Sequence, residues 1–137
     1  MAKKNGLGMT LTVDDSTGSG VAITNDVGSV SWTMPSAVQD VTGLDKSGHE
    51  RLLLLADFTI TINGFFNDAS SHIWAVFKNY RTLAASQTGR TTAIAISGQN
   101  LNNEVLYDDF PFTRGADGSF TCAPKGSLSD GTVPAYS

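Results

Sequence analysis

Cysteine is almost absent from this sequence of 137 residues: Cys122 is its only one, so no disulfide can form within the chain. That usage fits a reducing compartment. The sequence also lacks an Asn-x-Ser/Thr acceptor site, and no apolar stretch follows the two lysines near its start, so no signal peptide is indicated. Its longest apolar run, residues 52–56, is far shorter than the roughly 20 residues that span a bilayer, so no membrane insertion is expected.

Clusters of basic residues are missing as well. Nine Lys and Arg residues are scattered along the chain against thirteen Asp and Glu, which gives a formal net charge of −4. A protein that binds duplex DNA through its phosphates needs grouped cations, so this composition disfavours specific DNA binding. A mildly acidic surface repels DNA instead.

Motifs that carry catalysis or bind metals are also lacking. His49 and His72 are far apart and, with a single cysteine, provide no zinc-ligand spacing. There is no Gly-x-Ser-x-Gly elbow, and the adjacent Asp108 and Asp109 would point to opposite faces of a strand rather than form an acid–base pair. Cys122 is expected to be a buried structural thiol. We therefore predict no catalytic residue, no metal and no cofactor, and a protein that is not an enzyme.

Short alternating apolar segments between Gly, Asn and Asp clusters predict a single all-β dominated domain over residues 1–137. The expected architecture is a β-sandwich or partial barrel with one short flanking α-helix at about residues 69–80, where Ile73, Phe77 and Tyr80 recur at helical spacing. Strands are expected at residues 20–26, 29–34, 57–65, 92–97, 104–113 and 119–125. Pro35 should end or interrupt the second of these strands.

Three segments have too little apolar content to hold themselves in place. They are a flexible N-terminal arm (residues 1–19), a long charged loop (residues 39–51) and a C-terminal tail (residues 127–137). The large aromatic side chains, in contrast, fall at positions compatible with a core, and no exposed aromatic stripe is predicted. These side chains are Trp32, Phe58, Phe65, Trp74, Phe77 and Phe110.

Four consecutive leucines occupy residues 52–55. Successive side chains on a strand point to opposite faces, so a leucine run on a strand has two apolar faces to cover. We expect one alternating pair to lie in the core of the subunit and the other pair to be buried by a neighbouring molecule.

The order of these segments resembles that of the major tail tube proteins of long-tailed, siphovirus-type bacteriophages. The resemblance rests on "SVSWTM" (29–34), the loop "QDVTGLDKSGHERLLLLAD" (39–57), the strand "FTITINGFFND" (58–68), the helix "SSHIWAVFKN" (70–79) and the ending "LSDGTVPAYS" (128–137). It covers about residues 20–80 and again residues 119–136, through spacing rather than an invariant signature.

The resemblance implies a structural virion protein that self-assembles into stacked hexameric rings, which form the tail tube through which DNA reaches the host. The implied partners are further copies of the chain, a tape measure protein, a tail terminator and distal tail proteins. Double-stranded DNA would pass through the lumen without specific binding. The implied location is the virion tail, with assembly in the cytoplasm of the host bacterium.

Two sets of residues are expected to serve that assembly. The long loop is expected to contact the adjacent ring through Asp40, Val41, Thr42, Gly43, Leu44, Asp45, Lys46, Ser47, Gly48, His49, Glu50, Arg51, Leu52 and Leu53. Two small polar rows are candidates for lining the lumen, namely Ser29, Ser31 and Thr33 with Thr59, Thr61 and Asn63.

Other functions stay open on the sequence. One is another ring or tube component, such as a tail terminator or the inner tube of a contractile injection system. The other is a carbohydrate-binding β-sandwich module, although such a module usually presents a row of surface aromatic residues.

Overall fold

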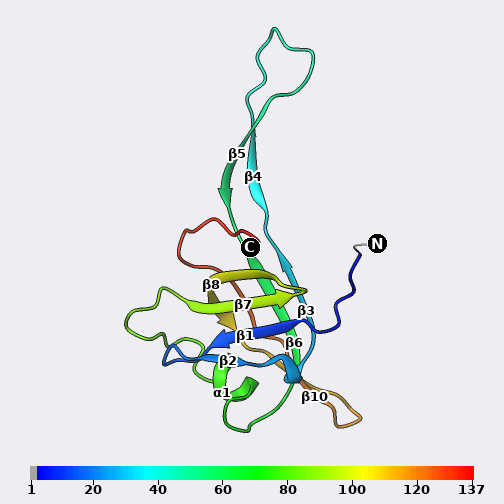
Figure 1. Ribbon diagram of the computed structural model, residues 1–137, viewed down its shortest axis with the longest axis vertical. Helices are drawn as coiled ribbons and strands as arrows, with labels where there is room; N and C mark the ends of the chain where they lie inside the picture. Colours follow the sequence, from blue (N-terminus) through cyan, green and yellow to red (C-terminus); the bar gives the residue numbers. More distant parts are fainter. Residues whose placement is uncertain (1–2) are drawn as a thin grey trace.

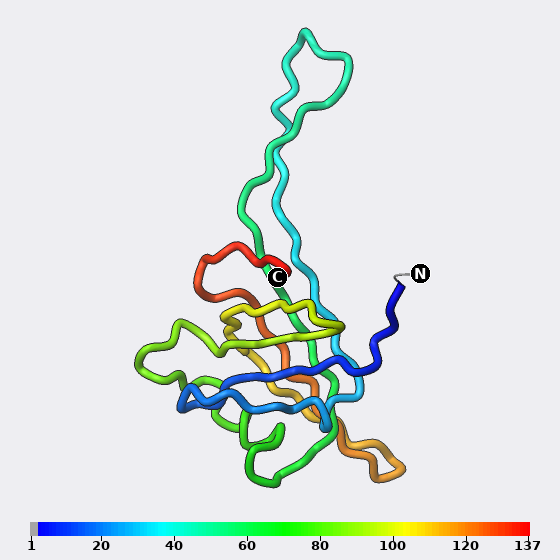
Figure 2. Tube along the Cα trace, viewed as in Figure 1, coloured from blue at the N-terminus to red at the C-terminus, as the bar shows by residue number. Residues whose placement is uncertain are grey.

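A curled antiparallel sheet forms the body of the protein, and a two-stranded hairpin projects from it (Figures 1 and 2). The computed structural model describes residues 3–137. The elements in chain order are β1 Thr10–Asp14, β2 Gly20–Ala22, the 3-10 helix η1 Thr24–Asp26, β3 Val27–Thr33, β4 Ser36–Asp40, β5 Arg51–Ala56, β6 Thr59–Phe65, α1 Ile73–Phe77, β7 Arg90–Ile96, β8 Gln99–Asp109, β9 Phe112–Arg114, β10 Phe120–Cys122 and β11 Lys125–Leu128. The expected all-β character and partial barrel are confirmed.

The sheet runs in the order β2-β1-β7-β8-β11-β6. β10 pairs with β6 on the same side as β11, and β9 pairs with β10, whereas β3 pairs with the other side of β6. Thr59 of β6 shows this arrangement, because it pairs with Ser127 of β11 on one side and with Thr33 of β3 on the other. The outer edges of β2 and β3 have no strand partner within residues 3–137. Each of these edges therefore presents backbone groups that can pair with another chain.

Only one face of the sheet is packed, because apolar side chains alternate along its strands. Leu11 and Val13 of β1 and Ile60 and Ile62 of β6 point into this core, while their neighbours in the chain point out. The remaining buried apolar residues are Ile23, Phe58, Ile73, Val76, Phe77, Ile94, Leu101, Val105, Tyr107 and Cys122. Burial raises the pKa of the Cys122 thiol to about 11, aided by the nearby Asp26 carboxylate, so Cys122 is the buried, uncharged thiol expected from the sequence.

The predicted N-terminal arm is corrected by the structure. Residues 10–14 form β1, which pairs with β2 and β7 and places Leu11 and Val13 in the core. The alternating "TLTVD" segment binds into the sheet although its surroundings are polar and rich in glycine. Residues 1 and 2 of the expected arm lie outside the described residues.

The C-terminal tail also makes defined contacts. Asn100 and Ser137 exchange two backbone hydrogen bonds of 2.7 and 2.8 Å. The side chain of Trp32 donates to the Tyr136 hydroxyl at 3.1 Å. The end of the predicted flexible tail is thus tied to β8 and β3, close to the base of the hairpin (Figure 1).

The α-helix is shorter than the predicted span of 69–80. Ser71 has φ 61°, in the left-handed region, and the helix begins only at Ile73. Its first N–H is held by the carboxylate of Asp26, at 3.2 Å, which also contacts His72 Nδ1 at 2.9 Å and Asn67 Nδ2 at 2.9 Å. Burial acts to raise the pKa of Asp26, but these hydrogen bonds outweigh it and hold that pKa below its usual value. A carboxylate distant in sequence therefore sets the start of the helix, and the side chain of the N-cap residue, His72, makes no capping hydrogen bond to the helix.

Arg90 ends the helix from the opposite side. This fully buried side chain of β7 donates to the backbone carbonyls of Val76, Asn79 and Thr82, and also to that of Asp14 at 3.3 Å. Burial lowers the pKa of Arg90, opposed mainly by the negative charge of Asp15. Since the guanidinium takes the carbonyls that further helical turns would use, the segment after Phe77 continues as turns.

Candidate assembly surfaces

The hairpin of β4 and β5 extends the β3–β6 ladder beyond the sheet (Figure 1). A neck of four residues joins the two parts: Met34 and Pro35 lead into β4, and Asp57 and Phe58 follow β5. One backbone hydrogen bond crosses this neck, from the Asp57 N–H to the Pro35 carbonyl at 2.8 Å. Pro35 cannot donate in return, so it interrupts the ladder as its sequence position predicts.

The four leucines of β5 are all exposed. Leu52, Leu53, Leu54 and Leu55 expose 53, 76, 49 and 87 % of their surfaces, and Val38 of β4 exposes 53 %. The prediction that one alternating pair belongs to the subunit core is therefore wrong, because the hairpin extends beyond the sheet and no layer covers either of its faces. Val38 pairs with Leu53 and Gln39 with Leu52, so both faces of the ribbon carry apolar side chains. We call Val38 and residues 52–55 the leucine strip.

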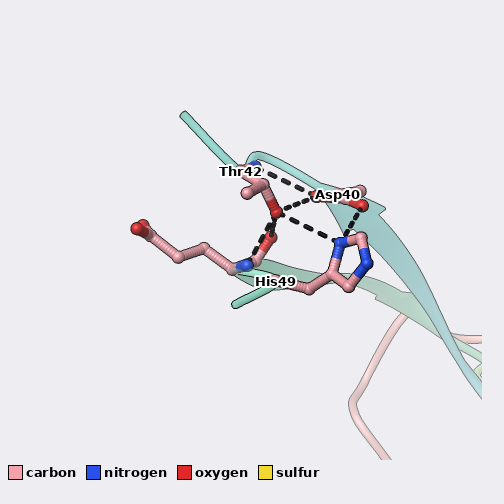
Figure 3. A network of polar contacts seen from close by, with 4 residues as sticks. Asp40, Thr42 and His49 are labelled. Carbon is pink, nitrogen blue, oxygen red and sulfur yellow. Dashed lines mark hydrogen bonds and ion pairs between the residues drawn. The ribbon is translucent and has the colours of Figure 1, made fainter. Parts of the chain in front are cut away.

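A small polar network locks the hairpin where its strands separate into the loop (Figure 3). The Thr42 hydroxyl donates to Asp40 Oδ1 at 2.5 Å and accepts the Glu50 N–H at 2.8 Å, while His49 Nδ1 lies 3.0 Å from Asp40 Oδ2. The hydrogen bonds from Thr42 lower the pKa of Asp40. Four of the predicted loop residues are thus brought together, and they fix the direction in which the loop leaves the hairpin.

Replacing Thr42 with valine tests this lock. Valine keeps the β-branched shape and removes the hydroxyl, so the Glu50 amide should exchange its hydrogen about 2- to 10-fold faster, the effect of losing one ordinary hydrogen bond. Exchange measured by NMR reports this directly. Ser47→Ala is the matched control, since the Ser47 side chain makes no hydrogen bond within the described part of the chain. Unchanged exchange at Glu50 in Thr42→Val would contradict the role of the hydroxyl.

The loop tip presents charge that the subunit does not use for its own stability. Lys46 lies 3.6 Å from Glu50 and 4.0 Å from Asp45, and all three side chains are at least half exposed. Exposed pairs of this kind contribute little to folding. These charges are therefore free to select a partner surface.

The two predicted polar rows form one continuous surface. Ser29 pairs with Asn63, Ser31 with Thr61 and Thr33 with Thr59 across β3 and β6, and all six side chains point away from the core. Hydrogen bonds join Thr33 to Thr59 at 2.6 Å and Asn63 to Ser29 at 3.2 Å. We call this surface and its continuation across the sheet the polar face.

That continuation was not assigned from the sequence. Through Ser127 of β11 the polar face reaches Leu106 of β8, and the same side of β8 and β7 carries Asn102 with Ala93, and Glu104 with Thr91. The alternation of "LNNEVLYD" in β8 contains the necessary signal. Apart from Leu106 and Phe65, the side chains on the unpacked side of these strands are therefore small or polar, and most are uncharged.

An aromatic cluster occupies the end of the molecule opposite the hairpin, although the sequence predicts no exposed aromatic stripe. Phe66, Phe112 and Phe120 expose 39, 36 and 41 % of their surfaces and are backed by Trp74 and Phe110. Of the residues predicted to be core, Phe58 and Phe77 are buried, whereas Phe65 is 56 % exposed. The sequence pattern does not distinguish a phenylalanine buried in the core from one exposed on the surface of the single chain.

Metal and membrane features are reported for the described chain only. Among residues 3–137, no three His, Cys, Asp or Glu side chains lie close enough together to hold a metal ion. No helix in that range has the length and apolar content to cross a bilayer.

Comparison with known proteins finds solved structures that share this fold. No family model and no curated protein sequence matches this chain. The solved chains that match it include two that are covered over nearly their whole lengths, both with a TM-score of 0.71. The fold is that of a chain in a gene transfer agent tail. One match is to the virion of a native gene transfer agent particle, at 14 % identity, covering 98 % of this chain and 99 % of the other. The second is to the tail of an empty gene transfer agent particle with C6 symmetry, at 19 % identity, covering 98 % of both chains.

Proposed function

We propose that this protein is a structural subunit of a phage-type tail tube, built from stacked hexameric rings that conduct DNA to the host. The observation that carries the proposal is the end-to-end match with a chain from a C6-symmetric tail. A fold shared over the full length, without a domain left over, supports a whole-chain role of the same kind. The virion tail is the corresponding location, after assembly in the host cytoplasm.

Ring closure uses the two edges of the sheet. The outer edges of β3 and β2 are unpaired in the described chain, and edges of this kind pair readily with other strands. In a closed ring the β3 edge of one subunit meets the β2 edge of the next, so neither of these two edges remains open. Six copies then share one continuous sheet around a bore.

The polar face is proposed to line that bore. It carries hydroxyl and amide side chains with few charges, and its acidic Glu104 and Asp108 disfavour phosphate binding. Its one lysine, Lys125, is 3.7 Å from the Asp109 carboxylate. Double-stranded DNA thus passes without specific binding, and a tape measure protein fills the bore during assembly.

Ring stacking uses the hairpin. Residues 40–53 reach beyond the body of the subunit and are proposed to contact the adjacent ring. The tail terminator and distal tail proteins then bind the two ends of the stack. A head-to-tail contact does not close on itself, so it adds ring upon ring.

Electron microscopy of the purified protein tests this function. At high concentration the protein should form rings with six-fold symmetry and a central hole, or tubes of stacked rings. Analytical ultracentrifugation at the same concentrations checks that assembly is not caused by the grid. A protein that stays monomeric in all conditions and binds a glycan array would instead support the carbohydrate-binding alternative.

A further inference from the structure

In the described chain, exposed large apolar side chains gather into a group in two places. One is the leucine strip on the hairpin; the other is the aromatic end, which we define as Phe66, Phe112 and Phe120. Grouped apolar exposure on a folded protein usually marks a binding surface. Each surface therefore requires an occupant.

The aromatic end is a preformed surface. Phe112 and Phe120 are stacked with their centroids 5.2 Å apart, and Phe66 lies 5.1 Å from Phe120. Behind them Trp74 lies 5.5 Å from Phe66 and 5.8 Å from Phe112. Aromatic side chains that are held in place by other aromatic side chains lose little conformational freedom on binding. They are therefore suited to anchor aliphatic side chains of a partner.

The two surfaces lie at opposite ends of the molecule. The hairpin projects from one end of the sheet, whereas β10 and α1 lie at the other end (Figure 1). A single copy cannot cover its aromatic end with its own hairpin, because the body of the sheet separates them. A second copy placed head to tail can cover both.

The borders of the two surfaces carry charges of both signs. Arg51 precedes the leucines, and Asp68 follows Phe66 by two residues. Both are exposed, and neither makes an ion pair within residues 3–137. Asp57, two residues after Leu55, and Arg114, which pairs with Phe120 across β9 and β10, add the opposite charge at each border, so recognition between the two surfaces rests on apolar contact rather than on charge.

We propose that the leucine strip of one copy docks on the aromatic end of a second copy. This inference rests on the proposed function and deepens it, because it names the surface that receives the hairpin. The contact joins two different surfaces, so each added copy leaves one of each free for the next.

Two charge substitutions, alone and mixed, test the docking. Leu53→Asp disables the strip and Phe120→Asp the aromatic end, while Val133→Asp places the same charge on an exposed apolar side chain outside both surfaces and outside the polar face. Each of the first two should block stacking alone, and Val133→Asp should stack like the wild type. An equal mixture of the two blocked variants has one intact strip and one intact aromatic end per pair. It should form complexes that stop after one contact, measured by light scattering and electron microscopy.

Cysteine crosslinking detects the contact between the leucine strip and the aromatic end even if no tubes form. Leu53→Cys mixed with Phe120→Cys, both in a Cys122→Ala background, should give mainly mixed dimers under mild oxidation. Dimers of Leu53→Cys with itself, or no crosslink above that of a Val133→Cys control, would overturn the docking. Normal tubes from a folded Phe120→Asp variant would overturn it as well and leave the tail tube function standing. Failure of the wild-type protein to form rings or tubes counts against the tail tube function, and the crosslink still decides the docking.

Discussion

Threonine at all four leucine positions, residues 52–55, is expected to leave the monomer folded and to abolish stacking. These side chains are about half to nine-tenths exposed, so the free energy of unfolding of the monomer should change by only about 1–2 kcal/mol in total. Threonine also keeps the strand preference of the hairpin. In an assembly the same positions lose their apolar contact, and full burial of one leucine stabilises by roughly 1.5–3 kcal/mol. Thermal melting of the monomer and microscopy of its assembly measure the two effects separately.

A buried leucine provides the control for that experiment. Leu101→Ala removes a side chain that is only 2 % exposed and should cost the monomer about 2–5 kcal/mol. If the four-threonine variant melted as early as Leu101→Ala, the strip would be part of the subunit's own core. If it stacked like the wild type, the strip would not be an interface.

Changes in the loop beyond the leucines should impair assembly in a different way. Replacing residues 44–50 with a Gly-Ser linker should also spare the fold, because surface loops tolerate such changes. It removes the Lys46 and Glu50 charges together with His49, so stacked rings should lose their register rather than their apolar contact.

Arg90→Ala is expected to have the largest effect on the fold itself. The guanidinium is fully buried and holds four backbone carbonyls, which join the segment after α1 to β1 and β7. Removing one partner of a buried charged network should cost roughly 3–5 kcal/mol, less than the sum of about 1.5–3 kcal/mol for each hydrogen bond, because contributions within one network are not additive. For a chain of this length that corresponds to a fall in melting temperature on the order of 10 °C.

Two control variants show whether the effect of Arg90→Ala depends on the forked hydrogen bonds of this buried arginine. Arg90→Lys keeps the positive charge with fewer, unforked donors and should lie between the wild type and Arg90→Ala. Arg114→Ala removes an exposed arginine of β9 and should change stability by no more than about 0.5 kcal/mol. A wild-type melting temperature for Arg90→Ala would show that the buried network does not stabilise the fold.

Most of the fold prediction depends on the alternation of apolar and polar residues along the strands. That prediction is correct where a strand packs against other parts of the same chain. The strand at residues 57–65 and the polar rows beside it followed from period-two patterns, and β6 with β3 has that form. The helix was predicted too long because its limits are set by Asp26 and Arg90, which belong to distant segments. Local sequence contains no record of such long-range hydrogen bonds.

The candidate interfaces were harder to predict for a related reason. A leucine buried by its own subunit and one buried by a neighbour look alike in sequence, so residues 52–55 were assigned half to the core. Phe65 of β6 is likewise expected inside and is exposed. Exposure in the isolated chain, which only the structure provides, separates these side chains from the core.

The neck of the hairpin has a mechanical consequence. Ladders with many hydrogen bonds lie on either side of it, but at Pro35 and Asp57 a single backbone bond holds the two strands together. Under load, such a joint yields before the continuous ladders do. A tube that joins its rings through these necks would therefore bend at the gaps between rings, with each ring and its bore keeping a constant cross-section around the curve.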